Sequence, residues 1–308
     1  MVSTDVEKSR LSEEATKSAA SKVTGRHALY VAFIVASGII TWKFWLTLAL
    51  YSFHEDSYSH ILLIPLVSFF LIYGTKDIVF VETQSSIGLG TAFVSLGLFA
   101  FWLANRHRIL GEDRTYLFQA SLSILSMWTG GFLLCYGRKA ARAALFPLMF
   151  LLLMVPLPDV ILARVIHLLE EGSTAIAFLI FKAAGVPVFR QGFVLSLPTV
   201  SIEVASECSS IRSSIALLIT CVLAARFFLR TTWRAWLFVA LVVPLSVLKN
   251  GIRIATLTLL SIYVDPRFLT GSLHREGGFV FFFLALAMLW PVLLLLQRSE
   301  RGARNPPG

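Results

Sequence analysis

Long apolar runs separated by short polar segments occupy most of this chain. A run of about 20 apolar residues is long enough to cross a bilayer as a helix. The pattern therefore predicts an all-α polytopic membrane protein with about eight transmembrane helices. Several runs are shorter than that length, so we expect tilted helices or local thinning of the bilayer. The runs cover residues 28–53, 60–73, 87–104, 116–136, 143–157, 211–229, 235–248 with an extension, and 279–297.

The pattern changes between the fifth and sixth runs. Residues 160–185 form an amphipathic stretch, and residues 186–203 alternate around Gly192 and Pro198. We interpret the first as a helix lying at the membrane interface and the second as a short β-hairpin on the outer face. If residues 160–185 crossed the membrane instead, the basic carboxyl tail would face outward.

The two ends of the chain are polar. We expect residues 1–26 to be a disordered cytoplasmic tail, residues 27–297 to be a single transmembrane domain, and residues 298–308 to be a basic cytoplasmic tail. Positively charged loops favour the cytoplasmic side, which predicts an amino terminus inside. The basic residues behind this orientation are Lys76, Arg138, Lys139, Arg142, Arg226, Arg230, Arg234, Arg298, Arg301 and Arg304, opposed by Arg106, Arg108 and Arg114.

Composition excludes several functional classes. The chain is 56% hydrophobic and only 15% charged, and its net charge of +9 is spread between apolar runs. This distribution indicates contact with membrane lipids and argues against nucleic-acid binding. The three cysteines, Cys135, Cys208 and Cys221, have neither a metal-ligand spacing nor an even number, so we expect no metal, no cofactor and no structural disulfide. Cys135 and Cys221 lie inside apolar runs, where a thiol behaves as a small hydrophobe.

Cys208 lies in a different setting, immediately before an apolar run. Its sulfur would sit beside the first turn of a helix, where free N–H groups and the nearby cation of Arg212 favour the nucleophilic thiolate. An inert cysteine at the membrane interface is the alternative.

Two further polar groups lie at the same predicted boundary. Arg253, in Lys249-Asn250-Gly-Ile-Arg253, interrupts an apolar stretch and should reach the outer edge of the bilayer. For Lys249 we expect only snorkelling of the ammonium toward water. His274 precedes the last run, and His60, at the outer start of the second run, faces the same side.

Together these groups permit thiol chemistry. His274 would accept and return a proton, Cys208 would attack a carbonyl carbon, and Arg253 would stabilise the developing oxyanion. Arg253 could instead bind a substrate carboxylate. The residues do not decide whether His274 or His60 carries the proton.

Three segments, Cys208-Ser-Ser-Ile-Arg212, Asn250-Gly-Ile-Arg253 and His274-Arg-Glu-Gly277, resemble in order and spacing the signature segments of the exosortase/archaeosortase family. Tyr58-Ser-His60 is similar to that family too, and the likeness extends from about Tyr51 to Trp290. The chain departs from the family at Glu207-Cys208-Ser209-Ser210, where Ala-Cys-Ser-Gly is common. The departure keeps the nucleophile but leaves the recognised substrate motif open.

The resemblance implies a membrane-embedded cysteine transpeptidase with Cys208, Arg253 and His274 as its catalytic set, supported by Arg212, Asn250 and His60. Its substrates would be secreted proteins with a carboxyl-terminal sorting tail: a short motif such as Pro-Glu-Pro, a hydrophobic span and a basic cluster. The resemblance also implies a multi-pass protein of the bacterial inner membrane, with the active site on the periplasmic face. In bacteria such enzymes commonly accompany exopolysaccharide production.

Two other classes remain open. A transporter or channel would explain Arg253 as the lining of a polar path, without needing Cys208. The sequence has no clear internal repeat, and its ionisable residues gather at one face, which argues against this class. A non-catalytic assembly factor for polysaccharide export is the other alternative.

Overall fold

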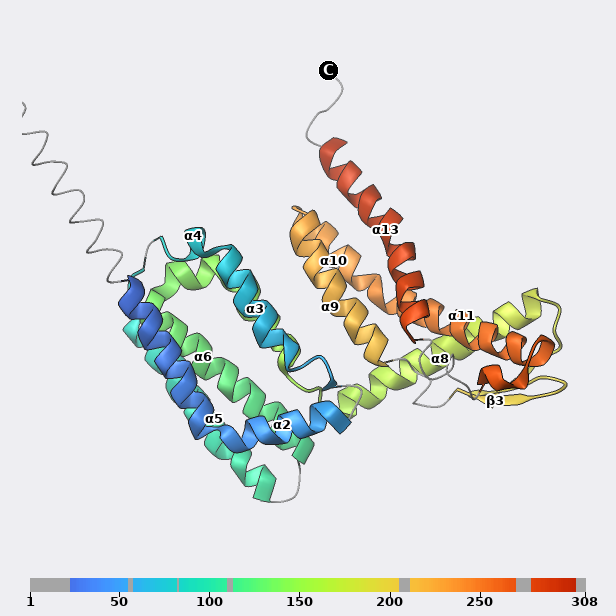
Figure 1. Ribbon diagram of the computed structural model, residues 1–308, viewed down its shortest axis with the longest axis horizontal. Coiled ribbons are helices and arrows are strands. Elements are labelled where there is room, and N and C mark those ends of the chain that lie inside the picture. The colour runs from blue at the N-terminus through green and yellow to red at the C-terminus, as the bar shows by residue number, and fades with distance from the viewer. Residues whose placement is uncertain are drawn as a thin grey trace, which may run out of the picture. The chain divides into compact units, whose positions relative to one another are not determined.

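The computed structural model describes residues 23–54, 58–81, 83–109, 113–204, 211–269 and 278–302. The chain divides into two compact units, Met1–Pro158 and Asp159–Gly308, and each is described separately (Figure 1). Cys208 and His274 lie outside the described residues.

The prediction of an all-α polytopic membrane protein is confirmed. Within the described ranges, six helices are long and apolar enough to cross a membrane. The number becomes seven if Leu145–Met154 and Asp159–Ala183 are taken as one broken span, so it stays below the eight expected. The six are Val23–Ile40, Ile87–Arg106, Arg114–Ala143, Ile211–Phe228, Thr232–Tyr263 and Gly278–Arg301.

Two apolar runs behave differently from the prediction. The first run forms two helices instead of one: the first helix ends at Ile40, and α2 (Trp42–His54) begins after a break at Thr41. At this break the Thr41 hydroxyl donates to the Ser37 carbonyl at 2.7 Å, a type of bond that often bends helices. The second run forms α3 (Leu63–Gly74), whose 12 residues are too few for a full bilayer crossing.

Glycines bring the long helices of the first unit together. A Cβ on Gly130 would lie 2.7 Å from the backbone nitrogen of Val94 and 2.8 Å from the carbonyl oxygen of Gly90. The backbones of α5 (Ile87–Ile109) and α6 (Asp113–Ala143) therefore touch at this point, as they commonly do in membrane helix pairs. The remaining elements of the unit are α4 (Lys76–Val79), α7 (Leu145–Phe150) and the short 3₁₀ helix η2 (Leu151–Met154).

The second unit contains five α-helices, one short 3₁₀ helix and one small sheet among its described residues. The predicted hairpin is present, with its turn at Gly192 (φ 61°), and a third strand extends it into an antiparallel sheet of order β1-β2-β3. In sequence order the elements are α8 (Asp159–Ala183), β1 (Phe189–Gln191), β2 (Val194–Ser196), β3 (Ser201–Glu203), α9 (Ile211–Phe228), α10 (Thr232–Ala240), α11 (Val242–Tyr263), η4 (Pro266–Leu269) and α13 (Gly278–Gly302).

Helices α8 and α11 lie side by side in the second unit (Figure 1). A glycine on each helix faces a branched side chain on the other. A Cβ on Gly172 would lie 2.7 Å from Cγ1 of Val247, and one on Gly251 would lie 2.4 Å from Cγ2 of Ile176. Because both helices keep a four-residue interval between these positions, the contact repeats once per helical turn.

A polar cluster ties α13 to the turn between α9 and α10. The Glu300 carboxylate accepts backbone N–H groups of Arg230 and Thr231, the latter at 2.8 Å, and lies 3.8 Å from the Arg234 guanidinium. The cluster gathers basic residues at the end of the unit where α9 ends and α13 ends.

Candidate active site

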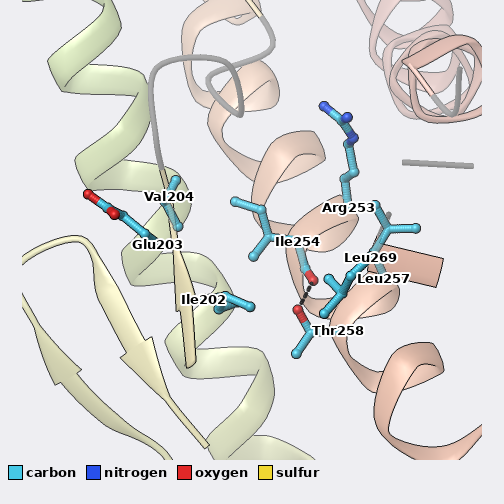
Figure 2. Close-up of a pocket in the computed structure, with 8 residues that line it drawn as sticks. All are labelled: Ile202, Glu203, Val204, Arg253, Ile254, Leu257, Thr258 and Leu269. Carbon is cyan, nitrogen blue, oxygen red and sulfur yellow. Dashed lines mark hydrogen bonds between the residues drawn. The ribbon is translucent and has the colours of Figure 1, made fainter. Parts of the chain in front are cut away.

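Arg253 lines a small pocket of about 80 Å³ in the second unit (Figure 2). Strand β3, helix α11 and the 3₁₀ helix η4 form its walls, which are mostly aliphatic. Its lining consists of Ile202, Glu203, Val204, Arg253, Ile254, Leu257, Thr258 and Leu269. A guanidinium at the edge of an apolar wall is poorly screened by water, which strengthens its attraction for an anion.

Two lining residues are also the last described residues before gaps in the description. Val204 precedes the segment that contains Cys208, and Leu269 precedes the segment that contains His274. After these gaps the chain resumes at Ile211 in α9 and at Gly278 in α13. The described structure therefore brings Arg253 together with the chain positions that lead into the other two predicted catalytic residues.

The side chain of Arg253 is half-buried and extends beyond the aliphatic walls of the pocket (Figure 2). Glu203, the other charged lining residue, is exposed and its carboxylate points away from Arg253. Thr258, one turn further along α11, donates its hydroxyl to the Ile254 carbonyl at 2.8 Å within its own helix. The guanidinium is thus the group best placed to meet a negative charge at this edge of the pocket.

Asn250 holds α11 against α8. Its side chain is 1% exposed, and its Nδ2 donates to the Ser173 hydroxyl at 3.0 Å. Ser173 is itself fully buried, so the bond joins two polar groups inside the helix pair. Asn250 was predicted as a supporting residue, and the structure gives it this packing role one turn before Arg253.

Lys249 does not snorkel, and that expectation is wrong. Its side chain is 1% exposed, and its ammonium donates a hydrogen bond to the Ser213 hydroxyl of α9. The sequence holds one signal for this role, a Lys-Asn pair interrupting an apolar run one helical turn before Arg253. That signal could not identify Ser213, which is 36 residues away in the chain.

Arg212 lies in the first turn of α9 and is exposed. The neighbouring Ser213 faces the interior of the unit, where Lys249 reaches it. At the start of α9, the cation of Arg212 therefore points outward, and the ammonium of Lys249 contacts the helix from the interior. The positive end of the helix dipole lies at the same place.

His60 belongs to the first unit. Its Nε2 lies 3.2 Å from the Leu153 carbonyl oxygen and donates to it when it carries the ring proton. Burial lowers the pKa of His60, and the hydrogen bond to Leu153 opposes this effect. Participation of His60 in the chemistry stays a prediction.

The other two cysteines are buried and free, as predicted for Cys135 and Cys221. Cys221 packs inside an apolar cluster of α9, α10, α11 and α13. In the part of the chain that the structure describes, no three His, Cys, Asp or Glu side chains are grouped to hold a metal ion.

The sequence of this chain matches one known protein family. The model of the family described as transmembrane exosortase (Exosortase_EpsH) matches residues 27–291. The match extends through both compact units and contains every predicted site residue. No curated protein and no solved structure matches the chain.

Proposed function

Because the chain belongs to the transmembrane exosortase family, a family of membrane cysteine transpeptidases, we propose that it cleaves the sorting tails of secreted proteins. The nucleophile is Cys208, and Arg253 and His274 complete the catalytic set. Substrates carry a short motif, one hydrophobic span and a basic cluster at their carboxyl end. The reaction takes place at the periplasmic face of a bacterial inner membrane.

The observation that carries the proposal is that Arg253, Val204 and Leu269 line one pocket. An extended chain covers about 3.5 Å per residue. Because Cys208 is four residues beyond Val204 and three before Ile211, it can be at most about 14 Å from Val204 and about 10 Å from Ile211. His274 is five residues beyond Leu269 and four before Gly278, which limits its distance in the same way. All three groups can therefore meet at the pocket.

The chemistry follows from the three side chains. His274 takes the proton of the Cys208 thiol, and the sulfur bonds to the carbonyl carbon between motif and span while Arg253 stabilises the charge that develops on the carbonyl oxygen. The C–N bond then breaks, and His274 gives a proton to the departing amine. An acceptor amine or water attacks the thioester, gives its proton to His274 and releases the sulfur.

Membrane embedding would assist this reaction. A substrate held by a single transmembrane helix presents its scissile bond at a fixed height in the bilayer. Restricting the search to two dimensions and one depth lowers the entropic cost of aligning the reacting groups. The aliphatic wall formed by Ile202, Val204 and Leu257 suits an apolar part of the peptide, and the exposed Arg212 suits an acidic recognition residue.

The deciding experiment follows the size of a co-expressed tailed substrate. Cys208→Ala should abolish shortening of the substrate, whereas the buried, free Cys221→Ala should leave shortening intact. Unchanged shortening by Cys208→Ala, with normal membrane insertion, would contradict the proposal and favour transport or scaffolding. Thiol labelling of intact spheroplasts should modify Cys208 and spare Cys135 and Cys221, and reversal of that pattern would contradict the periplasmic placement.

A further inference from the structure

Lys249 is a buried cation whose place in the fold the proposed reaction does not explain. Lys249 lies on α11, which is part of the apolar span Thr232–Tyr263, and it is only 1% exposed. An ammonium removed from water costs several kcal/mol unless it gains strong interactions. Ionisable residues that persist inside a membrane span are therefore default candidates for function.

The ammonium of Lys249 connects two helices of the site. It donates to the hydroxyl of Ser213, two residues after Ile211, where α9 begins. On α11, Arg253 follows Lys249 by four residues, so both side chains lie on the same helical face. One contact thus fixes the first turn of α9 to the helix that carries the pocket arginine.

Positive charge accumulates at this end of the second unit. Lys249 and Arg253 share a face of α11, and the first turn of α9 adds the positive end of its dipole and the exposed Arg212. The charges of Lys249 and Arg253, which are buried and half-buried, are weakly screened and stabilise an anion placed before the start of α9, whereas the exposed Arg212 contributes less. Cys208 precedes that start by three residues in the chain.

We propose that Lys249 is a positioning residue that holds the first turn of α9 through Ser213 and adds a second positive charge beside Arg253. The inference rests on the proposed function, because it assigns this charge to supporting a thiolate at Cys208. Lys249 itself does not touch the substrate.

The experiment measures alkylation of Cys208 by iodoacetamide, without substrate, in full-length protein carrying Cys135→Ala and Cys221→Ala. Lys249→Met keeps the side chain long and removes its charge, Ser213→Ala removes the acceptor, and Lys249→Arg restores a cation. The matched control is Lys182→Met, an exposed lysine of α8 stacked over Phe178.

Because iodoacetamide reacts with the thiolate, Lys249→Met should slow alkylation about tenfold, the effect of one lost charge at short range in a partly screened site. Ser213→Ala should slow it about threefold, because the cation remains but α9 is no longer held. Lys249→Arg should recover most of the rate, and Lys182→Met should match the parent.

An unchanged or faster rate for Lys249→Met would overturn the inference, as would a rate for Lys182→Met that falls equally. If Lys249→Met does not assemble, Lys249→Arg and Ser213→Ala decide, because equal rates for these two would contradict the role of Ser213. Tail processing is scored separately in the protein that retains all three cysteines. If the otherwise unchanged protein does not process tails, the proposed function is refuted, whereas the alkylation rates still decide the role of Lys249.

Discussion

Two helix pairs, α5–α6 in the first unit and α8–α11 in the second, both close through glycine but do so differently. At α5–α6 the close approach is between backbones, since Gly130 faces the carbonyl of Gly90 and the nitrogen of Val94. At α8–α11 each glycine faces a branched side chain, and a buried Asn250–Ser173 hydrogen bond lies between the two contacts.

The α5–α6 contact packs two helices together, whereas the α8–α11 contact also holds a helix that carries charged residues of the candidate site. The described contacts between α5 and α6 are made by glycines, by side chains such as Leu134 and Met127, and by a hydrogen bond from the Ser126 hydroxyl to the Phe93 carbonyl, and none of them involves a charged side chain. Helix α11 carries Lys249, Asn250 and Arg253 within two turns, and α8 fixes that helix from one side. Interlocked small and large residues leave α11 little freedom to slide along α8. Arg253 therefore stays at the pocket, and Lys249 stays in contact with α9.

The sharpest test of the comparison is Arg253→Ala. If the α8–α11 pair positions this guanidinium for the reaction, removing the guanidinium should lower the rate of tail processing about 10²- to 10³-fold, the usual effect of losing one oxyanion donor. The free energy of unfolding should change little, because Arg253 is half-buried and extends beyond the pocket wall.

The matched control for Arg253→Ala is Arg267→Ala, an exposed arginine of η4 in the same unit. It should process tails at the parent rate, as followed by gel mobility of a co-expressed substrate. Equal loss in both variants would mean that overall positive charge matters rather than the placement of Arg253.

The sequence predicted the parts of the fold that depend on local pattern. Apolar runs located most helices within a few residues, and the alternation around Gly192 located the first two strands. The break at Thr41 escaped prediction because Ser37 and Thr41 are compatible with a continuous apolar helix and bend it only through their own carbonyl contacts. The third strand was not predicted as a separate strand, because Ser201–Glu203 follows Pro198 inside the segment that we interpreted as a two-stranded hairpin.

The candidate site was only partly accessible to sequence reasoning. A charge in an apolar run identified Arg253, and the structure places it in a pocket beside the segments that lead to Cys208 and His274. The burial of Lys249 depends on Ser213, and the packing of Gly251 depends on Ile176. Such partners are distant in the chain, so no local pattern reveals them.

A second prediction concerns the backbone contact of the first pair. Gly130→Val should lower the free energy of unfolding by about 3 kcal/mol, the upper part of the range for overpacking, because its Cβ meets backbone atoms that no rotamer change can move. Unfolding in mixed dodecylmaltoside–SDS micelles measures the loss.

Truncating the neighbouring side chain serves as the control for Gly130→Val. Adding Val94→Ala should recover little, because the backbone nitrogen of Val94 and the carbonyl of Gly90 remain in place. Full recovery by Val94→Ala would show that side chains, not backbones, limit the approach of α5 and α6.

A third prediction uses the exchangeable contact of the second pair. Gly172→Ala should destabilise the protein by about 1–2 kcal/mol, because its Cβ overlaps the branched side chain of Val247. Val247→Ala in the same protein removes the overlapping methyl groups, leaves its Cβ at an ordinary contact distance of 3.5 Å, and should restore most of the unfolding free energy and of the processing rate.

The result that would contradict this exchange is additive loss. If Gly172→Ala and Val247→Ala together cost the sum of their separate effects, the two residues would not share a contact, and α8–α11 would resemble α5–α6. The measurement is a double-mutant cycle on unfolding free energy, which isolates the pairwise contribution.

The smallest expected effect belongs to the buried hydrogen bond between Asn250 and Ser173. Interhelical hydrogen bonds in membrane proteins contribute on average about 0.6 kcal/mol and at most about 1.7 kcal/mol, so Ser173→Ala should lie in that range. Thr174→Val is the matched control, since its hydroxyl bonds only the Glu170 carbonyl of its own helix. If both variants are equally stable, the polar contact between α8 and α11 adds nothing to their packing. A loss confined to Ser173→Ala, accompanied by slower tail processing, would instead show that this one bond helps to keep the helix of Arg253 in register.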